Sequence, residues 1–317
     1  MSFPVFDLHC DTAFALLGAD YTKHISLLEN SCHIDLKRAG VNPAYAQCFA
    51  CFTCLPESLD VPIDPETLFK REYENLITEL DKNAHMIRLA KCATDIRENA
   101  EAGLMSAILT LEGPAGFGFD SGRLPELYEK GFRITTLSWN ESNCLTGSHI
   151  TGGGLTEQGK TYVKTAQQLG MVIDVSHISD QAFWDIMDMT EKPVIATHSN
   201  SRSVCNVSRN LTDDMFLQIC RCGGVAGVNL YSEFLGEQAN LDTVCHHIFH
   251  FLELDPTGKH IALGGDLDGC DSLPAGFDGV QSYPVIAEYL LDRGLSNQQI
   301  NNIFWNNALG VMEQCCT

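Results

Sequence analysis

Eight short apolar runs alternate with helical patterns along this 317-residue chain, and the alternation limits the folds open to it. The runs are Val5–Cys10, Ala46–Phe52, Ser106–Leu111, Arg133–Ser138, Val172–Ser176, Val194–Thr197, Gly224–Leu230 and Ile261–Gly264. Most are continuously apolar, as is typical of parallel strands that are buried on both faces. Eight strand–helix units of this kind predict an α/β protein with a (β/α)8 TIM-type barrel.

Helical patterns fill the segments between the runs. They cover Pro65–Leu89, Thr156–Leu169, Asp213–Cys222 after the capping candidate Thr212, and Ser296–Leu309 with Ser296 as its N-cap. No Pro/Ser-rich or charge-block linker divides the chain, so we expect residues 1–317 to form a single catalytic barrel domain. A Rossmann fold is the alternative, but no G-x-G-x-x-G sequence follows the first run.

The composition excludes several classes of partner. The net charge is -21 and the pI about 4.7, which argues against nucleic acid and against an anionic membrane surface. Residues 1–4 carry no basic segment, and no apolar run is long enough to span a bilayer. We therefore expect a soluble cytoplasmic protein whose 14 cysteines are free thiols, and we interpret the Cys48-Phe49-Ala50-Cys51 spacing, with Cys54, as buried thiols.

Side chains that can bind metal follow five of the eight runs. They are His9 and Asp11 at the first run, Glu112 after the third, His177 after the fifth, His198 after the sixth, and Asp266 and Asp268 after the eighth. In a barrel the carboxyl ends of all strands surround one cavity, so we expect these side chains to meet there. Taken singly, the two later histidines fit buried core residues, and the two last aspartates fit a turn.

This set of residues predicts a metal centre. Five ligands, namely His9, Asp11, Glu112, His177 and His198, exceed the three protein ligands that are usual for one open catalytic zinc. Two ions that share a carboxylate and a water would accommodate them, at a separation of about 3.5–4 Å. Such a water ionises near neutral pH and becomes a nucleophile. The predicted chemistry is metal-assisted hydrolysis of an amide-like bond.

Six motifs, taken in order, give the chain a resemblance to a known family. They are Asp7-Leu8-His9-Cys10-Asp11, Leu111-Glu112-Gly113, Ile173-Asp174-Val175-Ser176-His177, Ile195-Ala196-Thr197-His198-Ser199, Ser208-Arg209-Asn210 followed by Asp213-Asp214, and Gly264-Gly265-Asp266-Leu267-Asp268-Gly269. In their order and spacing, nearly end to end, the chain resembles the membrane dipeptidase (renal dipeptidase) family of zinc peptidases, as a soluble microbial-type member.

The resemblance implies a (β/α)8 barrel with two zinc ions that hydrolyses dipeptides, including dipeptides with a D-residue at the C-terminal position. One zinc would be held by His9 and Asp11, the other by His177 and His198, and Glu112 would bridge them. A hydroxide shared by the ions would attack the peptide bond. Asp266 would handle the proton, and Arg209 would clamp the terminal carboxylate of the substrate. The resemblance also implies a homodimer.

Trp139 departs from the family pattern. Animal members carry a histidine after the fourth strand that contacts the substrate, and here Trp139 stands at that place in Thr136–Asn143. An indole can only donate one hydrogen bond, so polarisation of the substrate or the preferred substrate must differ. We expect Trp139 to contact the substrate, with His149 on the same loop as a candidate replacement for the missing histidine.

Two other functions stay open at this point. The first is an amidohydrolase-type metal enzyme acting on an N-acyl amino acid or a cyclic amide. Enzymes of that type use a modified lysine after the fourth strand as the metal bridge, and no lysine ends the fourth run here. The second is a non-enzymatic barrel that binds or scaffolds, which predicts lost metal ligands, and none of the expected ligands is lost.

Overall fold

A closed ring of parallel strands forms the centre of the molecule in the computed structural model, which describes residues 2–22, 24–58 and 62–316. Its strands are β1 (Val5–Cys10), β2 (Tyr45–Phe52), β3 (Ile87–Leu89), β4 (Met105–Glu112), β5 (Phe132–Thr135), β6 (Val172–Asp174), β7 (Val194–Ile195), β8 (Ala226–Val228) and β9 (Ile261–Leu263). They pair in parallel in the order β7-β6-β5-β4-β2-β1-β9-β8. A parallel bridge between Ala196 and Ala226 joins the two ends, so the predicted (β/α)8 barrel is confirmed.

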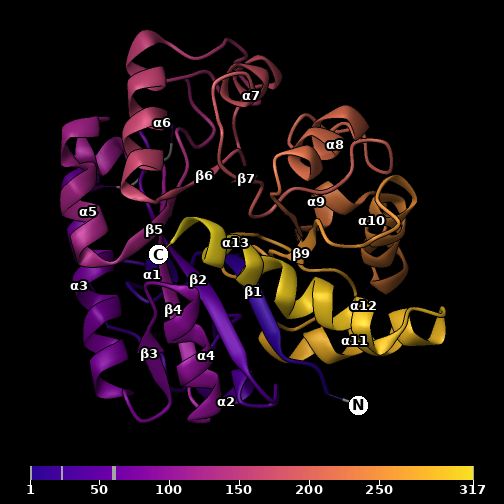
Figure 1. Cartoon of the computed structure of the whole chain (residues 1–317). Helices are drawn as coiled ribbons and strands as arrows, with labels where there is room; N and C mark the ends of the chain where they lie inside the picture. The colour runs from indigo at the N-terminus through magenta and orange to yellow at the C-terminus, as the bar shows by residue number, and fades with distance from the viewer. Residues whose placement is uncertain (1, 23, 59–61, 317) are drawn as a thin grey trace.

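Helices surround the ring of strands (Figure 1). They are α1 (Thr12–Ala15), α2 (Leu36–Ala39), α3 (Pro65–Lys82), α4 (Ala93–Glu101), α5 (Leu124–Lys130), α6 (Glu157–Leu169), α7 (Asp180–Met187), α8 (Asp213–Arg221), α9 (Ser232–Leu235), α10 (Leu241–Leu254), α11 (Tyr283–Asp292), α12 (Asn297–Asn301) and α13 (Asn307–Cys315). The outer strand faces are covered by these helices, which explains why the strands read as continuous apolar runs.

Side-chain caps fix where several helices begin. Thr212 accepts a hydrogen bond from Met215 N and Ser296 from Gln299 N, as the sequence predicts for these two positions, and Thr156, predicted as the first helical residue, is instead the cap that accepts from Gly159 N. The helical pattern starting at Ser296 is confirmed, but it continues to Cys315 through a π-helical turn at Asn302–Asn306.

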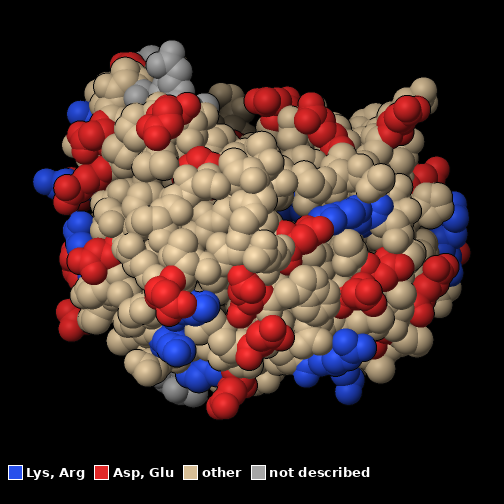
Figure 2. All heavy atoms as spheres, turned by 90° about the horizontal axis from the view of Figure 1, so that it is seen from above, with Lys and Arg blue, Asp and Glu red and all other residues tan. Residues whose placement is uncertain are grey.

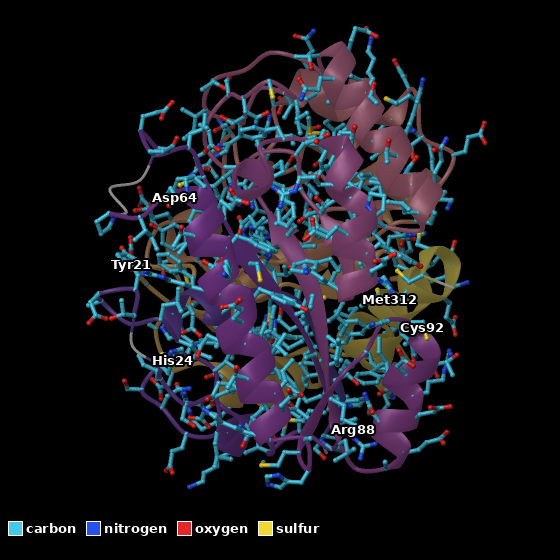
Figure 3. The ribbon with its side chains drawn as sticks, turned by 90° about the vertical axis from the view of Figure 1, so that its left-hand side faces the viewer. Tyr21, His24, Asp64, Arg88, Cys92 and Met312 are labelled. Atoms are coloured by element: carbon cyan, nitrogen blue, oxygen red, sulfur yellow. The ribbon has the colours of Figure 1, made fainter. Side chains whose placement is uncertain are left out.

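The predicted helix Pro65–Leu89 is wrong at its C-terminal end. The helix α3 begins after Asp64, whose carboxylate accepts from Thr67 N, and ends at Lys82, because Asn83 leaves the helical conformation. Residues 87–89 instead form β3, which pairs with β4 outside the main ring. Figure 3 shows this side of the molecule, with Asp64 at one end of α3 and Arg88 of β3 near the other end.

The last helix completes the core of the barrel. Alternate residues of the strands, among them Phe6, Leu8 and Ile108, form a buried cluster with Val311 and Met312 of α13. Burial of these side chains contributes about 1.5–3 kcal/mol each to the free energy of folding. The C-terminal segment is therefore part of the hydrophobic core on which the barrel depends.

Acidic side chains are spread widely over the surface. On the face drawn in Figure 2, Asp and Glu outnumber Lys and Arg and are interspersed with uncharged residues. Among the residues that the structure describes, no helix combines the length and the apolar character that crossing a bilayer requires.

Candidate metal centre

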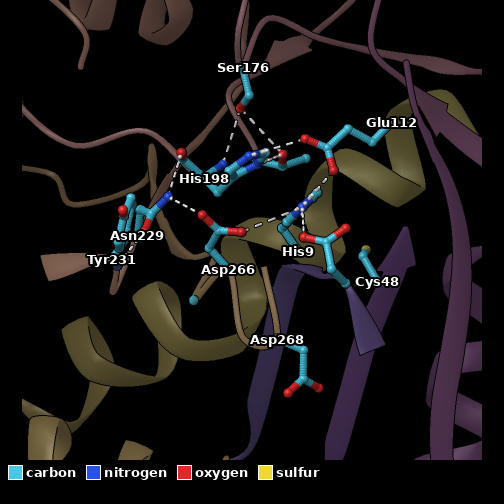
Figure 4. A network of polar contacts seen from close by, with 12 residues as sticks. His9, Cys48, Glu112, Ser176, His198, Asn229, Tyr231, Asp266 and Asp268 are labelled. Atoms are coloured by element: carbon cyan, nitrogen blue, oxygen red, sulfur yellow. Dashed lines mark hydrogen bonds and ion pairs between the residues drawn. The ribbon is translucent and has the colours of Figure 1, made fainter. Parts of the chain in front are cut away.

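Six of the predicted site residues meet at the carboxyl ends of five strands. His9 and Asp11 lie at the end of β1, Glu112 ends β4, and His177, His198 and Asp266 follow β6, β7 and β9. All six are at least nine-tenths buried. Figure 4 shows Glu112 on one side of His9 and Asp266 on the other. The barrel topology alone therefore assembles side chains that are far apart in sequence.

The Glu112 carboxylate faces two groups of histidines, one with each oxygen. Its Oε1 lies 2.8 Å from His177 Nε2 and 3.8 Å from His198 Nε2, while its Oε2 lies 3.2 Å from His9 Nε2. On the other side of His9, the Asp11 Oδ2 lies 3.4 Å from the same Nε2 atom. Glu112 thus occupies the position of a carboxylate that could bridge two cations.

His177 and His198 present unprotonated nitrogens to each other. His177 Nδ1 donates to Asn140 Oδ1 at 2.9 Å. The Thr197 hydroxyl donates its own proton to Asp174 Oδ2. Its oxygen, Oγ1, therefore accepts a hydrogen bond from His198 Nδ1 at 2.7 Å. In the neutral rings both Nε2 atoms then carry lone pairs, and they lie only 2.9 Å apart. This arrangement fits a cation bound between or beside them.

Other buried atoms of the site also lack partners. His9 Nε2 and Asp11 Oδ1 are buried and have no hydrogen-bond partner among the described residues. Gly269 leaves the space beside them open, because a Cβ atom there would lie 2.1 Å from Asp11 Oδ2 and 2.5 Å from Asp266 Oδ1. Imidazole nitrogens and carboxylate oxygens are ligands for zinc, so the donor set fits a divalent metal.

The charges of the site respond to burial and to one another. Burial, followed by the charge on Arg209, holds the pKa of His177 well below its ordinary value. Burial also lowers the pKa of His198, so both rings stay neutral and able to bind metal. Burial and the Glu112 carboxylate raise the pKa of Asp11 to about 6. Crowded, buried carboxylates of this kind are stabilised by a bound cation.

Buried carboxylates behind the ligands hold the local backbone in place. Asp7 accepts hydrogen bonds from His9 N and Gly265 N, both at 3.0 Å, and from the Tyr283 hydroxyl. The pairing of β1 with β2 shifts register between Asp7 and Cys10, which reorients the end of the strand. Asp174 plays a similar part for His198, by accepting from Thr197 N at 2.9 Å.

The two aspartates after β9 have different surroundings. Asp266 Oδ2 accepts from Asn229 Nδ2 at 2.9 Å, and its Oδ1 lies 3.9 Å from His9 Nε2. Burial raises the pKa of Asp266 to about 6. The charge of His9 opposes this rise, and the neighbouring carboxylates of Asp11 and Glu112 add to it. Asp268 accepts from Thr12 Oγ1 at 2.7 Å and from His33 N, which fits the turn-forming alternative for this residue.

Arg209 is a buried cation with free donors. The residue is 4% exposed, and its Nη1 donates to Ser199 Oγ at 2.6 Å. Its Nε and Nη2 are buried and have no hydrogen-bond partner among the described residues. Two unused donors on one guanidinium form a fork that matches a carboxylate.

A cavity of about 440 Å³ opens above the candidate metal-binding side chains. Asp11, Glu112, His177 and Asp266 contribute to its lining, and its aromatic wall consists of Phe14, Phe52, Trp139, Tyr231 and Phe234. The rings of Phe52 and Trp139 meet edge to face, with centroids 5.1 Å apart. The guanidinium carbon of Arg209 lies 5.8 Å from the Phe234 ring centroid, so Arg209 is next to this wall, although Arg209 itself is absent from the cavity lining.

His149, the candidate replacement for the missing histidine, is linked to the candidate metal ligand His177 through one intervening residue, Asn140. Its Nε2 donates to Asn140 Oδ1 at 2.9 Å, and its Nδ1 lies 2.9 Å from Ser208 Oγ. Asn140 Oδ1 also accepts from His177. Residue 149 is absent from the cavity lining, where Trp139 is present. His149 therefore supports His177 through Asn140 instead of facing the cavity.

Sequence reasoning assigned no role to several polar residues of the site, among them Asp7, Asn140 and Asn229. Asn229 follows β8, so the rule that selected residues at strand ends could have found it. Asp7 precedes His9 by two residues in an apolar run, where a buried carboxylate is itself a signal. Asn140 lies in a long loop between β5 and α6, and no local pattern marks it.

Comparisons with known proteins agree with this geometry. A model of the membrane dipeptidase family (peptidase family M19) matches residues 1–317. An uncharacterised protein of Klebsiella pneumoniae is 32% identical over 268 residues, which cover 80% of this chain and 98% of that protein. An uncharacterised dipeptidase of Schizosaccharomyces pombe is 32% identical over 214 residues, or 65% of this chain and 52% of that protein.

A solved structure has the same fold. It is a metallopeptidase from Rhodobacter sphaeroides liganded with a phosphinate mimic of the dipeptide L-Ala-D-Ala, with a TM-score of 0.90 and 24% sequence identity. The match covers 99% of this chain and 100% of that one. Because the family model matches the whole length of the chain, the chain belongs to the membrane dipeptidase family M19 and is a metal-dependent peptide-bond hydrolase.

Proposed function

We propose that this protein hydrolyses dipeptides with two zinc ions bound in one catalytic barrel formed by residues 1–317. The observation that carries the proposal is the division of the Glu112 carboxylate between His9 on one side and the pair of later histidines on the other. A single cation would leave one of these two groups without a partner. Two cations satisfy both.

Five residues would hold the two ions. His9 and Asp11 would bind the first, His177 and His198 the second, and Glu112 both. Zinc ions bound there would supply Lewis-acid polarisation of the scissile carbonyl and a shared hydroxide as the nucleophile at neutral pH. The neutral state of His177 and His198 favours this binding, because neither ring must lose a proton first.

Asp266 is suited to move the proton of the reaction. It faces the cavity, and Asn229 fixes one of its oxygens while the other points toward His9. A carboxyl group with a pKa of about 6 can accept a proton and release it again near neutral pH. We assign Asp266 the transfer of the proton to the leaving amine.

Arg209 would bind the terminal carboxylate of the substrate. Its two unused donors are buried beside the cavity wall, where a carboxylate would complete them. With the carboxylate fixed there, the cavity of about 440 Å³ limits the substrate to a short peptide. The Rhodobacter sphaeroides structure, which holds a mimic of L-Ala-D-Ala, supports a dipeptide and a D-residue at its C-terminal position.

An N-acyl amino acid is the second candidate substrate, because it carries the same terminal carboxylate that Arg209 would bind. The two candidates differ at the other end of the molecule. A dipeptide has a free cationic amine, which the acidic lining of the cavity favours, namely Asp11, Asp266, Asp268 and Asp271. An N-acyl group lacks that charge, so we place it second.

A substrate panel tests the proposal. It contains L-Ala-L-Ala, L-Ala-D-Ala, the matching dipeptide amide, a tripeptide and N-acetyl-alanine, and release of amino acids is measured with zinc-loaded protein. We expect hydrolysis of the two dipeptides, and little or none of the amide, the tripeptide and the N-acetyl compound. Preferred hydrolysis of N-acetyl-alanine would replace the dipeptidase proposal with the second candidate.

A further inference from the structure

Three side chains that can bind metal also meet at the opposite end of the barrel. They are Cys220 near the end of α8, Asp255 after α10 and His260 immediately before β9. One possible ligand atom from each lies within 4.8 Å of the other two. His260 precedes β9 and Asp266 follows it, so the strand separates this cluster from the candidate metal centre.

Aromatic packing brings the two helix ends together. The rings of Phe216 in α8 and Phe251 in α10 are stacked, with centroids 4.2 Å apart and an interplanar angle of 18°. Cys220 and Asp255 each lie four residues further along, which is one helical turn. The same packing therefore sets the thiol of α8 beside the carboxylate that ends α10. Figure 1 shows these two helices as neighbours.

The backbone fixes the orientation of His260. Its Nδ1 donates to the Gly224 carbonyl at 2.8 Å, and its own carbonyl accepts from Ala226 N at 2.9 Å in the pairing next to β8. A histidine that donates Nδ1–H to a carbonyl keeps its Nε2 lone pair for a ligand, which is the usual second contact of metal-binding histidines.

Asp255 has one oxygen in use and one without a partner. Its Oδ1 accepts from Thr257 N at 3.1 Å and from Thr257 Oγ1 at 2.6 Å. Its Oδ2 is buried and has no hydrogen-bond partner among the described residues, and the whole residue is only 9% exposed. A buried carboxylate oxygen left unpaired is costly unless a cation binds it.

We propose that Cys220, Asp255 and His260 form a second metal site in this chain, which binds a zinc-class divalent ion and has a structural role. Thiolate, imidazole and carboxylate together favour zinc over calcium or magnesium. At zinc–ligand distances of about 2.0–2.3 Å, tetrahedral ligand atoms of this set lie about 3.3–3.5 Å apart, so the three side chains need to close by about 1.5 Å at most.

The surroundings provide access and suggest the role. A cavity of about 300 Å³ reaches the cluster at His260, and its lining includes the polar residues Lys259, Asn302 and Asn307 but neither Cys220 nor Asp255. The cluster lies at the amino ends of the strands, where barrel enzymes keep residues that serve stability. The bound ion would tie α8 and α10 to the start of β9.

Cobalt is the probe that separates this site from the candidate metal centre. Co²⁺ bound to a thiolate gives a sulfur-to-cobalt charge-transfer absorption, and the proposed catalytic ligands contain no thiol. We expect the full-length protein loaded with Co²⁺ to show this absorption. Cys220→Ser should abolish it and His260→Gln should weaken Co²⁺ binding at the site by about 10-fold or more.

Cys222→Ser is the matched control, because Cys222 lies two residues away and is also half-buried, but is absent from the cluster. This variant should keep the absorption. No absorption in the wild-type protein, or one that survives Cys220→Ser, overturns the proposal. Circular dichroism and the thermal midpoint of each variant show that it is folded. The outcome is independent of peptide hydrolysis, so failure here leaves the dipeptidase proposal intact.

Discussion

Arg209 is a buried charged residue with one side-chain hydrogen bond to the part of the chain that the structure describes, from Nη1 to Ser199 Oγ. Burial lowers the pKa of Arg209, and the carboxylates of Asp266, Asp174 and Glu112 act against that effect. Charged donors left without partners destabilise the folded state, so a residue like this is retained for what it binds. At this scale the buried, unpaired Nε and Nη2 are the best guide to function.

Replacing Arg209 should separate carboxylate binding from the chemical step. We expect Arg209→Met to lower kcat/KM for L-Ala-D-Ala by about 100-fold, equivalent to about 3 kcal/mol, because a buried charge pair with the substrate is lost. Arg209→Lys should recover only part of it, since an ammonium does not form a bidentate pair. The weak hydrolysis of the dipeptide amide should change little, and an equal loss for both substrates would contradict the assignment.

Trp139 should act on the substrate side chain. Its ring packs against Phe52 in the aromatic wall and has no titratable group. We expect Trp139→Ala to lower kcat/KM about 10-fold for dipeptides with a large apolar N-terminal residue, because their contact area with the wall is lost. Steady-state kinetics on Gly-Ala and Phe-Ala provide the comparison. A uniform loss for both substrates would show that Trp139 serves the reaction itself.

At the scale of elements, the loop between β5 and α6 connects the two halves of the site. Ser208 next to Arg209 contacts His149, His149 donates to Asn140, and Asn140 accepts from His177. The chain of bonds fixes which nitrogen of His177 is protonated. It also ties the proposed carboxylate clamp to a proposed metal ligand.

Removing His149 should weaken metal binding at the His177 side of the centre. We expect His149→Phe to lower zinc affinity about 10-fold, the lower end of the loss that follows removal of a direct partner of a metal ligand, because His149 acts on His177 through Asn140. His149→Gln should retain most of the affinity, because its amide can donate to Asn140 and accept from Ser208. Competition with a chromophoric chelator measures both. Unchanged zinc affinity in His149→Phe would rule out this supporting role.

His247 makes α10 sensitive to acid. It is fully buried, accepts from Ser201 N at 3.1 Å and donates to Leu235 O at 3.2 Å. Burial lowers its pKa to about 4, so the unfolded chain binds this proton first as the pH falls below the ordinary histidine value. Stability from this residue is complete above about pH 6.5 and falls by about 3 kcal/mol between there and pH 4.

Urea unfolding of chelated protein at several pH values checks this expectation. His247→Gln keeps both hydrogen bonds without a titratable ring, so its stability should fall less steeply between pH 6.5 and 4. The comparison with wild type isolates His247 from the other acidic groups. Equal slopes in the two proteins would show that another group causes the acid sensitivity.

The sequence predicts helices and strands best where an apolar pattern is long or where a capping residue marks the start of a helix. The barrel follows from eight apolar runs, and two helices begin at their predicted caps, Thr212 and Ser296. The end of α3 was misplaced because Leu89 continues the apolar pattern of the helix, although tertiary pairing with β4 makes residues 87–89 a strand. Local pattern cannot show such pairing. It also cannot show that Asp268 contacts His33, which is 235 residues away.

At the scale of the whole molecule, we propose different roles for the two ends of the barrel: catalysis at the carboxyl ends of the strands and stability at the amino ends. The proposed metal ligands at the carboxyl ends of the strands come from four separate segments and Asp266 from a fifth, so the predicted cluster required only the topology. Partners such as Asn140 and His149 depend on the path of one loop, which the sequence does not encode in a readable pattern. The amino ends are closed by α13 and hold the Cys220 cluster, where packing serves stability.

The most direct test of the account is the hydrolysis of L-Ala-D-Ala as zinc is added back to chelated protein, with bound zinc counted per chain. We predict no activity without metal and full activity once the sites at His9–Asp11 and His177–His198 are both filled. In Cys220→Ser, which lacks the other proposed site, this point should come at two ions per chain, and Glu112→Gln should stay inactive at any zinc concentration. Activity in fully chelated protein, or full activity at one ion per chain, would contradict the two-zinc mechanism.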